Sequence, residues 1–453
     1  MKKIIIGCIL ILILPIVGCE QYLDEKPVRS LAVPTKLADL QAILDNENWM
    51  SWNVYPESGD IAADYYYMTD AVWAGRNETV RNRYVWAPTA DTQADWVNCY
   101  SRIFYTNTVL DNLDVVSLGG MTETQKAHIK GAALFMRAWN YLHLAQLFSP
   151  AYQEDVADEQ LGVPLKLTAD INEPIVRSTV RETYQRIITD LTESAKLLPE
   201  QVDIPLRPDA SAAYGALARV YLWMGDYEYT LQYADLVLGI DNELMDYNDI
   251  DSAASEPFAL FNPEVLYHVT MNATSGVFIR TNCLVDTNLV ASYLPGDLRQ
   301  PMYFAQQDNG DYQFKGDYSG SNVGTLFFGL ALDEVFLTKA EALARLNREE
   351  EAVEVLNQLL AKRWEADKFK PIKVSDTDNV LKLIIEERRK ELLFRGGIRW
   401  GDLKRLNLDP AFATELTRTI NGETHRLPPN DARYSFLIPT EVITLSGIKQ
   451  NHR

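Results

Sequence analysis

Aromatic and polar side chains alternate most densely between Asp60 and Trp86. A sugar presents apolar C–H faces and a rim of hydroxyl groups, so a protein binds it with flat aromatic rings and with acid, amide or guanidinium groups at their edges. Such binding requires neither a nucleophile nor a perturbed pKa. The segment is the richest local match in the chain to this combination of side chains. Its candidate contacts are Trp73, Tyr67, Arg76, Asn77, Tyr66 and Tyr65.

Packing is the alternative role for these aromatic residues. Trp73 is the strongest ligand candidate because small residues flank it in a polar stretch, whereas some of the consecutive tyrosines at 65–67 must pack against a helical frame. A second insertion offers weaker candidates, which are Tyr303, Tyr312 and Tyr318. Four tryptophans on predicted helices are assigned to the core: Trp96, Trp139, Trp223 and Trp400.

The first nineteen residues carry a second kind of chemistry. Lys2 and Lys3 precede an apolar run from Ile4 to Val17, which predicts a signal peptide over residues 1–18, with a short membrane anchor as the alternative. Gly18 and Cys19 follow directly and resemble a bacterial lipobox, in which the cysteine is acylated and becomes the new N-terminus. Several acyl chains hold a protein stably at a membrane.

Residues 19–30 would then form a lipidated N-terminus and tether. The acidic residues of this tether resemble the export tag of surface-facing lipoproteins in some gram-negative bacteria, and an ordinary solvated tether is the alternative. These acidic residues are Glu20, Asp24 and Glu25. The predicted location is the outer membrane, with the protein anchored by lipid and exposed at the cell surface.

Composition disfavours several other functions. The net charge of −20 opposes nucleic-acid binding, which needs clustered Lys and Arg. Beyond the signal peptide and Cys19, only Cys99 and Cys283 remain, and we interpret both as buried free thiols. No histidine pair has the HExxH spacing, and no GxSxG, GxGxxG or Walker A motif occurs. Among 63 acidic residues some close pair is inevitable, so carboxylates alone do not indicate a glycosidase. We therefore expect no cofactor, no metal and no catalysis.

Helical periodicity dominates the middle of the chain. Apolar stripes follow capping-box sequences at Thr122 and Thr179. Around Gly225 and Asn347 the small and apolar residues have the spacing of tetratricopeptide (TPR) helix pairs, with the left-handed turn at those two positions. Helices are predicted over residues 96–114, 122–148, 179–198, 211–238, 335–363 and 379–407. The charged run 386–391 is interpreted as a solvated or frame-bracing helix face.

These patterns predict a mainly α protein of four TPR-like helix pairs with long insertions between them. Residues 31–453 would form one unit, with helical segments at about 96–240 and 331–407. The segments 49–95, 241–330 and 408–453 show no helical pattern and are predicted to be loop-rich insertions. Insertions on a rigid frame are where binding commonly resides.

At this point the chain resembles the SusD/RagB family of outer-membrane nutrient-binding lipoproteins along essentially its whole length. The resemblance depends on several motifs in the family's order rather than on any one of them. They are the lipobox with Tyr22 to Pro27, Trp96 to Leu113, Gly131 to Phe148, Gly162 to Pro164, Arg177 to Val180, the repeat at 211–238, Glu341 with Arg345, Ile385 to Arg405, Phe436 to Pro439 and Gln450 with Asn451. The chain departs from the family at Arg395, where an acidic residue is common, and at its His452–Arg453 end.

The resemblance implies a right-handed superhelical scaffold of four TPR-like helix pairs, packed beside an irregular, loop-rich lobe. It further implies that the protein binds a nutrient oligo- or polysaccharide and delivers it to a SusC-like TonB-dependent transporter, without catalysis. Peptide binding of the RagB type, a secreted glycoside hydrolase and a pure protein scaffold are the alternatives. No ligand contact is transferred from the family, because its loop sequences do not align by motif.

Overall fold

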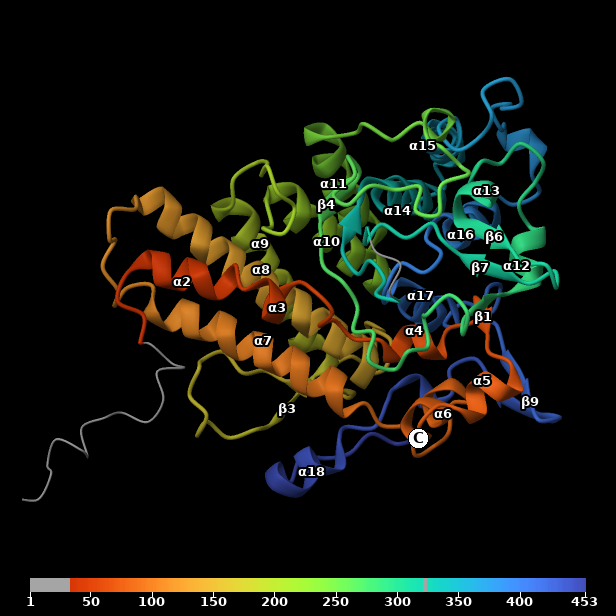
Figure 1. The fold of residues 1–453 in the computed structure, drawn as a ribbon. Helices are drawn as coiled ribbons and strands as arrows, with labels where there is room; N and C mark the ends of the chain where they lie inside the picture. Colours follow the sequence, from red (N-terminus) through yellow and green to blue (C-terminus); the bar gives the residue numbers. More distant parts are fainter. Residues whose placement is uncertain (1–32, 321–323) are drawn as a thin grey trace, which may run out of the picture.

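The computed structural model describes residues 33–320 and 324–453 (Figure 1). The predicted signal peptide, the lipidation site Cys19 and the tether up to residue 30 lie outside the described residues. The described residues form a mainly helical structure, which confirms the predicted fold class.

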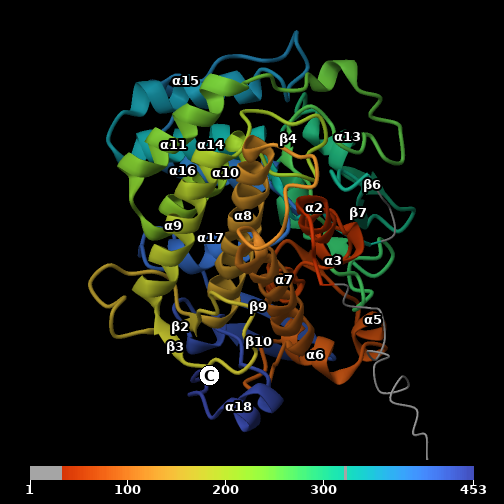
Figure 2. The same cartoon turned by 90° about the vertical axis from the view of Figure 1, so that its left-hand side faces the viewer.

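Nine longer helices form the frame. Each packs against its neighbour in the order α7–α8–α9–α10–α11–α14–α15, and α16 joins against α14 and α15 (Figures 1 and 2). Helix α11 packs on α14 although about ninety residues separate them, so the long insertion leaves the frame and returns to it. The bounds are α7 Gln93–Asn112, α8 Glu123–Phe148, α9 Val180–Leu197, α10 Ala210–Met224, α11 Tyr227–Ile240, α14 Leu332–Arg345, α15 Glu349–Leu360, α16 Val380–Glu391 and α17 Ile398–Leu406.

Local sequence signals set these helix ends. The Thr122 hydroxyl accepts a hydrogen bond from the Gln125 amide, and the Gln125 side chain accepts one from the Thr122 amide, which makes the predicted capping box. Thr179 and Glu182 form the same device at the start of α9. The turn between α10 and α11 places Gly225 at φ +79°, a left-handed conformation that favours glycine.

Helix α8 is the central helix of the frame. From Ala132 to Phe148 every side chain of α8 is buried, which explains why apolar residues occur on all of its faces. Trp139 stacks on Phe135 from one side and meets the His143 ring at its edge. His143 is buried within this aromatic cluster, as expected for a core histidine. The tryptophans assigned to the core, at 96, 139, 223 and 400, are all buried.

The segment 49–95, which shows no helical pattern in the sequence and was predicted to be loop-rich, includes several short helices. It contains α3, α4, α5 and α6, each only four to seven residues long, which is too short for an apolar stripe to repeat. The short helices outside the frame are α2 Leu37–Leu44, α3 Glu47–Met50, α4 Ser58–Ala62, α5 Asp70–Ala74, α6 Glu78–Tyr84, α12 Thr287–Ala291, α13 Arg299–Tyr303 and α18 Thr440–Ser446, with single 3₁₀ turns at Tyr247–Asp249, Val374–Asp376 and Ala432–Tyr434.

Short antiparallel strands organise the rest of the loop-rich lobe. One sheet has the order β1-β5-β7-β6, so β1 is an edge strand, and Tyr66 and Tyr67 pair with Val285 and Leu284. The remaining strands form three two-stranded ribbons, β2 with β3, β4 with β8 and β9 with β10. The strands are β1 Tyr66–Tyr67, β2 Leu161–Pro164, β3 Arg177–Thr179, β4 Val265–Tyr267, β5 Leu284–Val285, β6 Phe304–Gln306, β7 Tyr312–Phe314, β8 Leu330–Ala331, β9 Leu416–Ile420 and β10 Glu423–Leu427.

Buried ion pairs connect the frame helices to one another. They join α10 to α14, α16 to α17 and α17 to α14, and all six side chains are buried. The pairs are Arg219–Glu334, Arg388–Asp402 and Arg405–Glu341, with N–O distances of 2.5, 2.9 and 2.5 Å. Arg388 belongs to the charged run 386–391 on α16. Its ion pair with Asp402 of α17 supports the frame-bracing interpretation of that run.

A second buried network connects the frame to the loop-rich lobe through Arg363, which follows α15. Its guanidinium donates to both carboxylate oxygens of Glu264 at 2.8 and 2.9 Å and to Glu391 of α16 at 2.6 Å. Arg299 of α13 donates to Glu391 at 3.2 Å and to Glu387 at 2.6 Å. Because these charges are almost wholly removed from water, each depends on the others for its hydrogen bonds.

Replacing Arg363 with alanine should destabilise the protein strongly. The change leaves Glu264 and Glu391 buried with fewer partners, which costs about 3–5 kcal/mol in the free energy of unfolding measured by urea denaturation. The matched control is Arg348→Ala, because Arg348 pairs with Glu351 at 2.6 Å on the exposed surface. Its loss should cost less than about 1 kcal/mol. Equal stability of the two variants would contradict the role given to the buried network.

Candidate functional site

The predicted ligand segment folds into the end of α4, the strand β1 and the helices α5 and α6. Thr69 caps α5 by accepting from the Val72 amide at 3.3 Å. Asn77 caps α6 by accepting from the Val80 amide at 2.9 Å. The side-chain oxygen of Asn77 therefore holds the helix start, while the residue itself remains exposed to solvent.

Tyr65 and Tyr66 lie inside the protein, with only 2% and 3% of their surface exposed. The Tyr65 hydroxyl donates to Asp60 at 2.5 Å, and the Tyr66 hydroxyl donates to the Ile61 carbonyl oxygen at 2.8 Å. Arg418 of β9 lies over the Tyr66 ring. Both tyrosines pack the lobe in this structure, and neither ring presents a face to solvent.

Tyr67, Trp73 and Arg76 remain partly exposed. Tyr67 points away from the core on the edge strand, and its hydroxyl donates to Asp311 at 2.6 Å. Burial and the Asp311 carboxylate raise the pKa of Tyr67 to about 12. The Arg81 guanidinium lies 5.5 Å from the centre of the Trp73 ring, within cation–π range. We call the surface formed by Tyr67, Trp73, Arg76, Asn77 and Arg81 the α5–α6 surface.

Arg76 links this surface to the second insertion. Its Nη1 lies 3.4 Å from the carbonyl oxygens of Ser275 and Gly276. The Nε of Arg76 and the indole Nε1 of Trp73 have no hydrogen-bond partner. Both nitrogens are buried, so they are not exposed to a ligand lying on this surface. At the far side of α5, the Asn421 amide in the β9–β10 turn donates to Asp70 at 3.0 Å.

A buried pair of acids lies beneath the α5–α6 surface. Asp95 accepts from the Glu57 and Ser58 amides, and Glu57 accepts from the Ser275 hydroxyl at 2.6 Å. Burial is the main cause that raises the pKa of Glu57 to about 7, and Arg83 opposes it. Both carboxylates are buried, so this pair connects the two insertions to α7 rather than presenting an acid and a base to a substrate.

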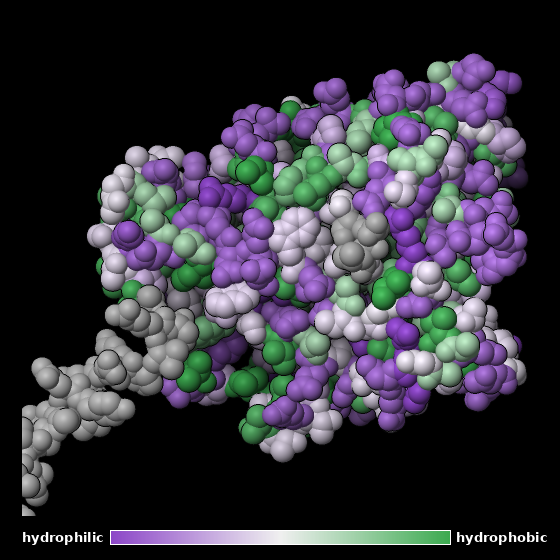
Figure 3. All heavy atoms as spheres, in the orientation of Figure 1, coloured by the Kyte–Doolittle hydropathy of each residue, from purple (hydrophilic) through white to green (hydrophobic). Residues whose placement is uncertain are grey.

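Sequence analysis did not single out Trp49, which is the most exposed tryptophan among the described residues, at 49%. Its ring stacks on Tyr105 of α7 with centroids 4.9 Å apart and planes 6° from parallel. The polar residues Asn46, Glu47 and Asn48 just before Trp49 are the signal that could have indicated an exposed ring. On the face shown in Figure 3, apolar side chains reach the surface as separate patches among hydrophilic ones.

The candidate tyrosines of the second insertion also include both buried and partly exposed side chains. Tyr303 and Tyr318 are buried, and both hydroxyls lie 3.2 Å from the Tyr247 hydroxyl. Tyr312 is only partly buried, beside the Asp311 that accepts from Tyr67. The structure thus brings the edge of this insertion to the α5–α6 surface. Arg395, the departure from the family pattern, is buried, pairs with Asp333 at 2.9 Å and lies over the Tyr318 ring.

Comparison with known proteins identifies the family. Residues 21–222 match a SusD-like family model described as starch-binding and associating with the outer membrane, and residues 316–435 match the model of the SusD family. The chain belongs to the SusD/RagB family. A curated relative, SusD-like protein P2 of Formosa agariphila, is 24% identical over the whole of this chain and 99% of its own length.

Solved structures of other SusD-like proteins share this fold. A putative sugar-binding protein from Bacteroides vulgatus superposes with a TM-score of 0.77 at 22% identity, over 93% of this chain and 99% of its own. A laminarin-binding SusD-like protein superposes with a TM-score of 0.65 at 17% identity, over 92% and 99% of the two chains. At these identities the likeness establishes the helical scaffold with its TPR-like pairs.

Two further observations apply to residues 33–320 and 324–453. Within them no helix is both long and apolar enough to cross a membrane. The same residues contain no cluster of three or more His, Cys, Asp or Glu side chains that could hold a metal ion. Cys99 and Cys283 are buried free thiols, as predicted.

The buried carboxyl of Asp60 should make the unfolding free energy of the protein depend on pH. Burial raises the pKa of Asp60 to about 7, even though it accepts from Tyr65 and from the Gly397 amide. In the unfolded chain the same group ionises near 4. The folded state therefore holds an extra proton between these values, so Asp60 lowers the unfolding free energy as the pH rises from about 4 to about 7.

The variant Asp60→Asn should reduce this loss of stability. Urea denaturation at about pH 4.5 and about pH 7.5 measures the difference in unfolding free energy, which should be smaller than in the unchanged protein. Asp155→Asn is the control, because Asp155 is exposed and its substitution should leave the difference unchanged. An unchanged difference in Asp60→Asn would show that the buried carboxyl keeps an ordinary pKa.

Proposed function

We propose that this protein is a cell-surface lipoprotein that binds a nutrient oligo- or polysaccharide at the α5–α6 surface and delivers it to a SusC-like TonB-dependent transporter. It acts by binding and not by catalysis. The observation that carries the proposal is the match of residues 21–222 to a family described as starch-binding and associating with the outer membrane. The laminarin-binding protein with the same fold supports a glycan as the ligand.

The geometry of the α5–α6 surface suits a sugar. The ring of Trp73 supplies an apolar platform, and Arg76, Arg81 and Asn77 supply polar groups around it. A sugar lying on the ring would pack one C–H face against the aromatic surface. Its hydroxyl oxygens would accept hydrogen bonds from these donors. Trp49 offers an aromatic face too, but its neighbour Glu47 is already engaged by the Trp52 indole N–H at 3.0 Å.

In this proposal the lipid anchor is attached to Cys19. The lipobox at Gly18–Cys19 would place the acyl chains at the start of the tether, ahead of the described residues. Three acyl chains would hold the protein at the outer membrane, which keeps a bound glycan close to a transporter in the same membrane. Proximity of this kind raises the effective concentration of the ligand at the second protein.

The variant Trp73→Ala should bind glycan about five- to thirtyfold more weakly, because it loses an apolar contact worth about 1–2 kcal/mol. Calorimetry with the glycan that the unchanged protein binds measures this. Trp49→Ala is the matched control: it also removes a partly exposed tryptophan, and it should keep its affinity. Loss of affinity in Trp49→Ala with full affinity in Trp73→Ala would contradict the placement of the site.

The variant Cys19→Ala should lose its membrane attachment, since it has no thiol to acylate. Metabolic labelling with a palmitate analogue and membrane fractionation test this. The full chain should carry the label and sediment with outer membranes, whereas the variant should be unlabelled. Cys99→Ala is the control and should still be labelled, because Cys99 is a buried thiol on α7. An unlabelled full chain would refute lipidation at Cys19.

A further inference from the structure

Arginines without a carboxylate partner are uncommon on the surface of this protein. The chain has 63 acidic residues against 43 Lys and Arg. Most of the partly exposed arginines in the described part of the chain form an ion pair. The exceptions, which pair with no described carboxylate, are Arg76, Arg81, Arg177, Arg280 and Arg453.

Two of these exceptions hold the C-terminal tail in place. Arg177 donates to the carbonyl oxygens of Gly162 and Lys449 at 2.8 and 3.0 Å. Arg453 donates to the carbonyl oxygen of Ala87 at 3.0 Å. Backbone carbonyl oxygens therefore take the place of a carboxylate at both positions, and both guanidinium groups are used within the fold.

The other three exceptions lie in the α5–α6 surface or next to it. Arg76 and Arg81 belong to this surface, and the Arg81 Nη1 donates to the Arg76 carbonyl oxygen at 3.1 Å. Arg280 belongs to the same loop of the second insertion as Gly276, whose carbonyl oxygen lies 3.4 Å from the Arg76 Nη1. Three guanidinium groups on neighbouring segments thus lack a carboxylate among the residues that the structure describes.

Parts of the Arg76 and Arg81 guanidinium groups remain open to solvent. Backbone carbonyl oxygens occupy the Nη1 of each group. The Nη2 of both arginines and the Nε of Arg81 form no hydrogen bond with a described residue, and none of these atoms is enclosed by the protein, in contrast to the buried Nε of Arg76. The Nε and Nη2 of Arg81 present the pair of parallel N–H donors that a carboxylate or a sulfate accepts.

The acids around the α5–α6 surface leave these guanidinium groups unpaired. Asp70 of α5 accepts from the Asn421 amide at 3.0 Å. Glu78 is exposed in the first turn of α6, where a negative charge stabilises the helix end. Glu57 lies buried beneath the surface and pairs with Arg83 at 3.5 Å. None of these three carboxylates forms an ion pair with either open guanidinium group.

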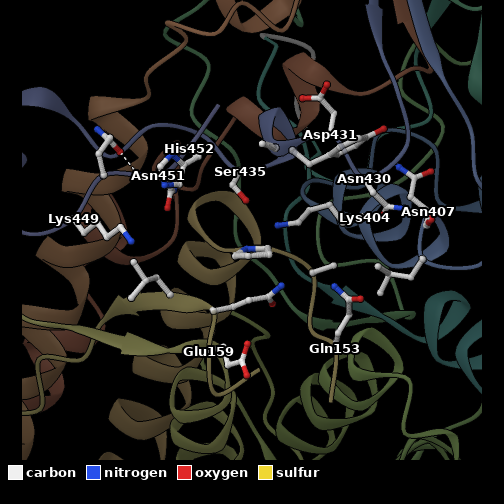
Figure 4. A pocket seen from close by; sticks show the side chains of 18 residues that line it. Gln153, Glu159, Lys404, Asn407, Asn430, Asp431, Ser435, Lys449, Asn451 and His452 are labelled. Carbon is white, nitrogen blue, oxygen red and sulfur yellow. Dashed lines mark hydrogen bonds between the residues drawn. The ribbon is translucent and has the colours of Figure 1, made fainter. Parts of the chain in front are cut away.

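A cavity of about 620 Å³ at the C-terminal ends of α8 and α17 also has cations in its lining (Figure 4). They are Lys404 and Lys449, and the acids Glu159 and Asp431 line the same space. The Lys404 ammonium donates to two backbone carbonyl oxygens at 2.6 and 2.5 Å, so it caps the end of α8. This cavity therefore mixes both signs of charge, whereas the α5–α6 surface offers unpaired cations beside an aromatic ring.

We propose that the α5–α6 surface selects a glycan whose sugars carry an anionic group, either a carboxylate or a sulfate ester. A sugar on the exposed part of the Trp73 ring would bring this group to Arg81, whose guanidinium lies 5.5 Å from the ring centre. The inference rests on the glycan capture proposed above and names the class of glycan. The net charge of −20 repels a polyanion at long range, so the selection is local, within a screening length of about 8 Å at physiological salt.

Calorimetry with matched polymers tests the selection at about 0.15 M salt, where long-range repulsion is screened. Polygalacturonate and its methyl ester share a backbone and differ in the carboxylate charge, and dextran sulfate and dextran form the corresponding sulfate pair. At least one charged polymer should bind about tenfold more tightly than its neutral counterpart, because hydrogen bonds to a charged acceptor are the stronger ones. The pair that shows the preference distinguishes a carboxylate from a sulfate ester.

The variant Arg81→Gln removes the charge and keeps a side-chain amide that can donate to the same backbone carbonyl oxygens. It should bind the preferred charged polymer about tenfold more weakly and the neutral polymer as the unchanged protein does. Arg81→Lys, which keeps the charge without the paired donors, should have an intermediate affinity. Arg207→Gln is the matched control: it changes the net charge equally, but Arg207 pairs with Asp45 at 2.7 Å, so its affinity should not change.

Three results would overturn the inference: equal affinity within both polymer pairs, failure of both charged polymers to bind, or equal losses in Arg81→Gln and Arg207→Gln. The proposed glycan capture fails separately. It would stand if a neutral polysaccharide bound the unchanged protein and bound Trp73→Ala more weakly, even when the charged polymers showed no advantage. Both proposals would fail if no polysaccharide, charged or neutral, bound the protein.

Discussion

Pairing of buried charges is the constraint on which the rest of this structure depends. Arg363 contacts Glu264 from the loop-rich lobe and Glu391 from α16, so the same guanidinium holds two parts of the chain together. Such charges are costly to bury unless each has its partners in place. The frame and the lobe therefore specify each other, and the surfaces proposed for ligands are held on a rigid support.

Local signals made much of the frame predictable. The capping boxes at Thr122 and Thr179 and the turns at Gly225 and Asn347 appear in the structure where the sequence places them. Each depends only on residues a few positions apart. Ion pairs such as Arg219–Glu334 join residues more than a hundred positions apart, and no periodic pattern in the sequence predicts them. The β9–β10 hairpin did have a signal in the sequence, the Asn421–Gly422 turn, which lies in the segment 408–453 that was predicted to be loop-rich.

Which side chains of the candidate segment are buried and which are exposed was not predictable residue by residue. Three consecutive tyrosines have the same composition, yet strand β1 directs Tyr66 inward and Tyr67 outward, and only pairing with β5 decides which. The partners of Arg76, the carbonyl oxygens of Ser275 and Gly276, come from the other insertion.

The central claim is that this member of the SusD/RagB family captures carbohydrate by binding it. Affinity electrophoresis of the purified protein through gels containing different polysaccharides tests this most directly, because retardation needs neither a transporter nor a membrane. We predict that at least one polysaccharide retards the protein and that its chain length is unchanged afterwards. Unretarded migration through every polysaccharide, together with binding to a peptide library, would contradict the account.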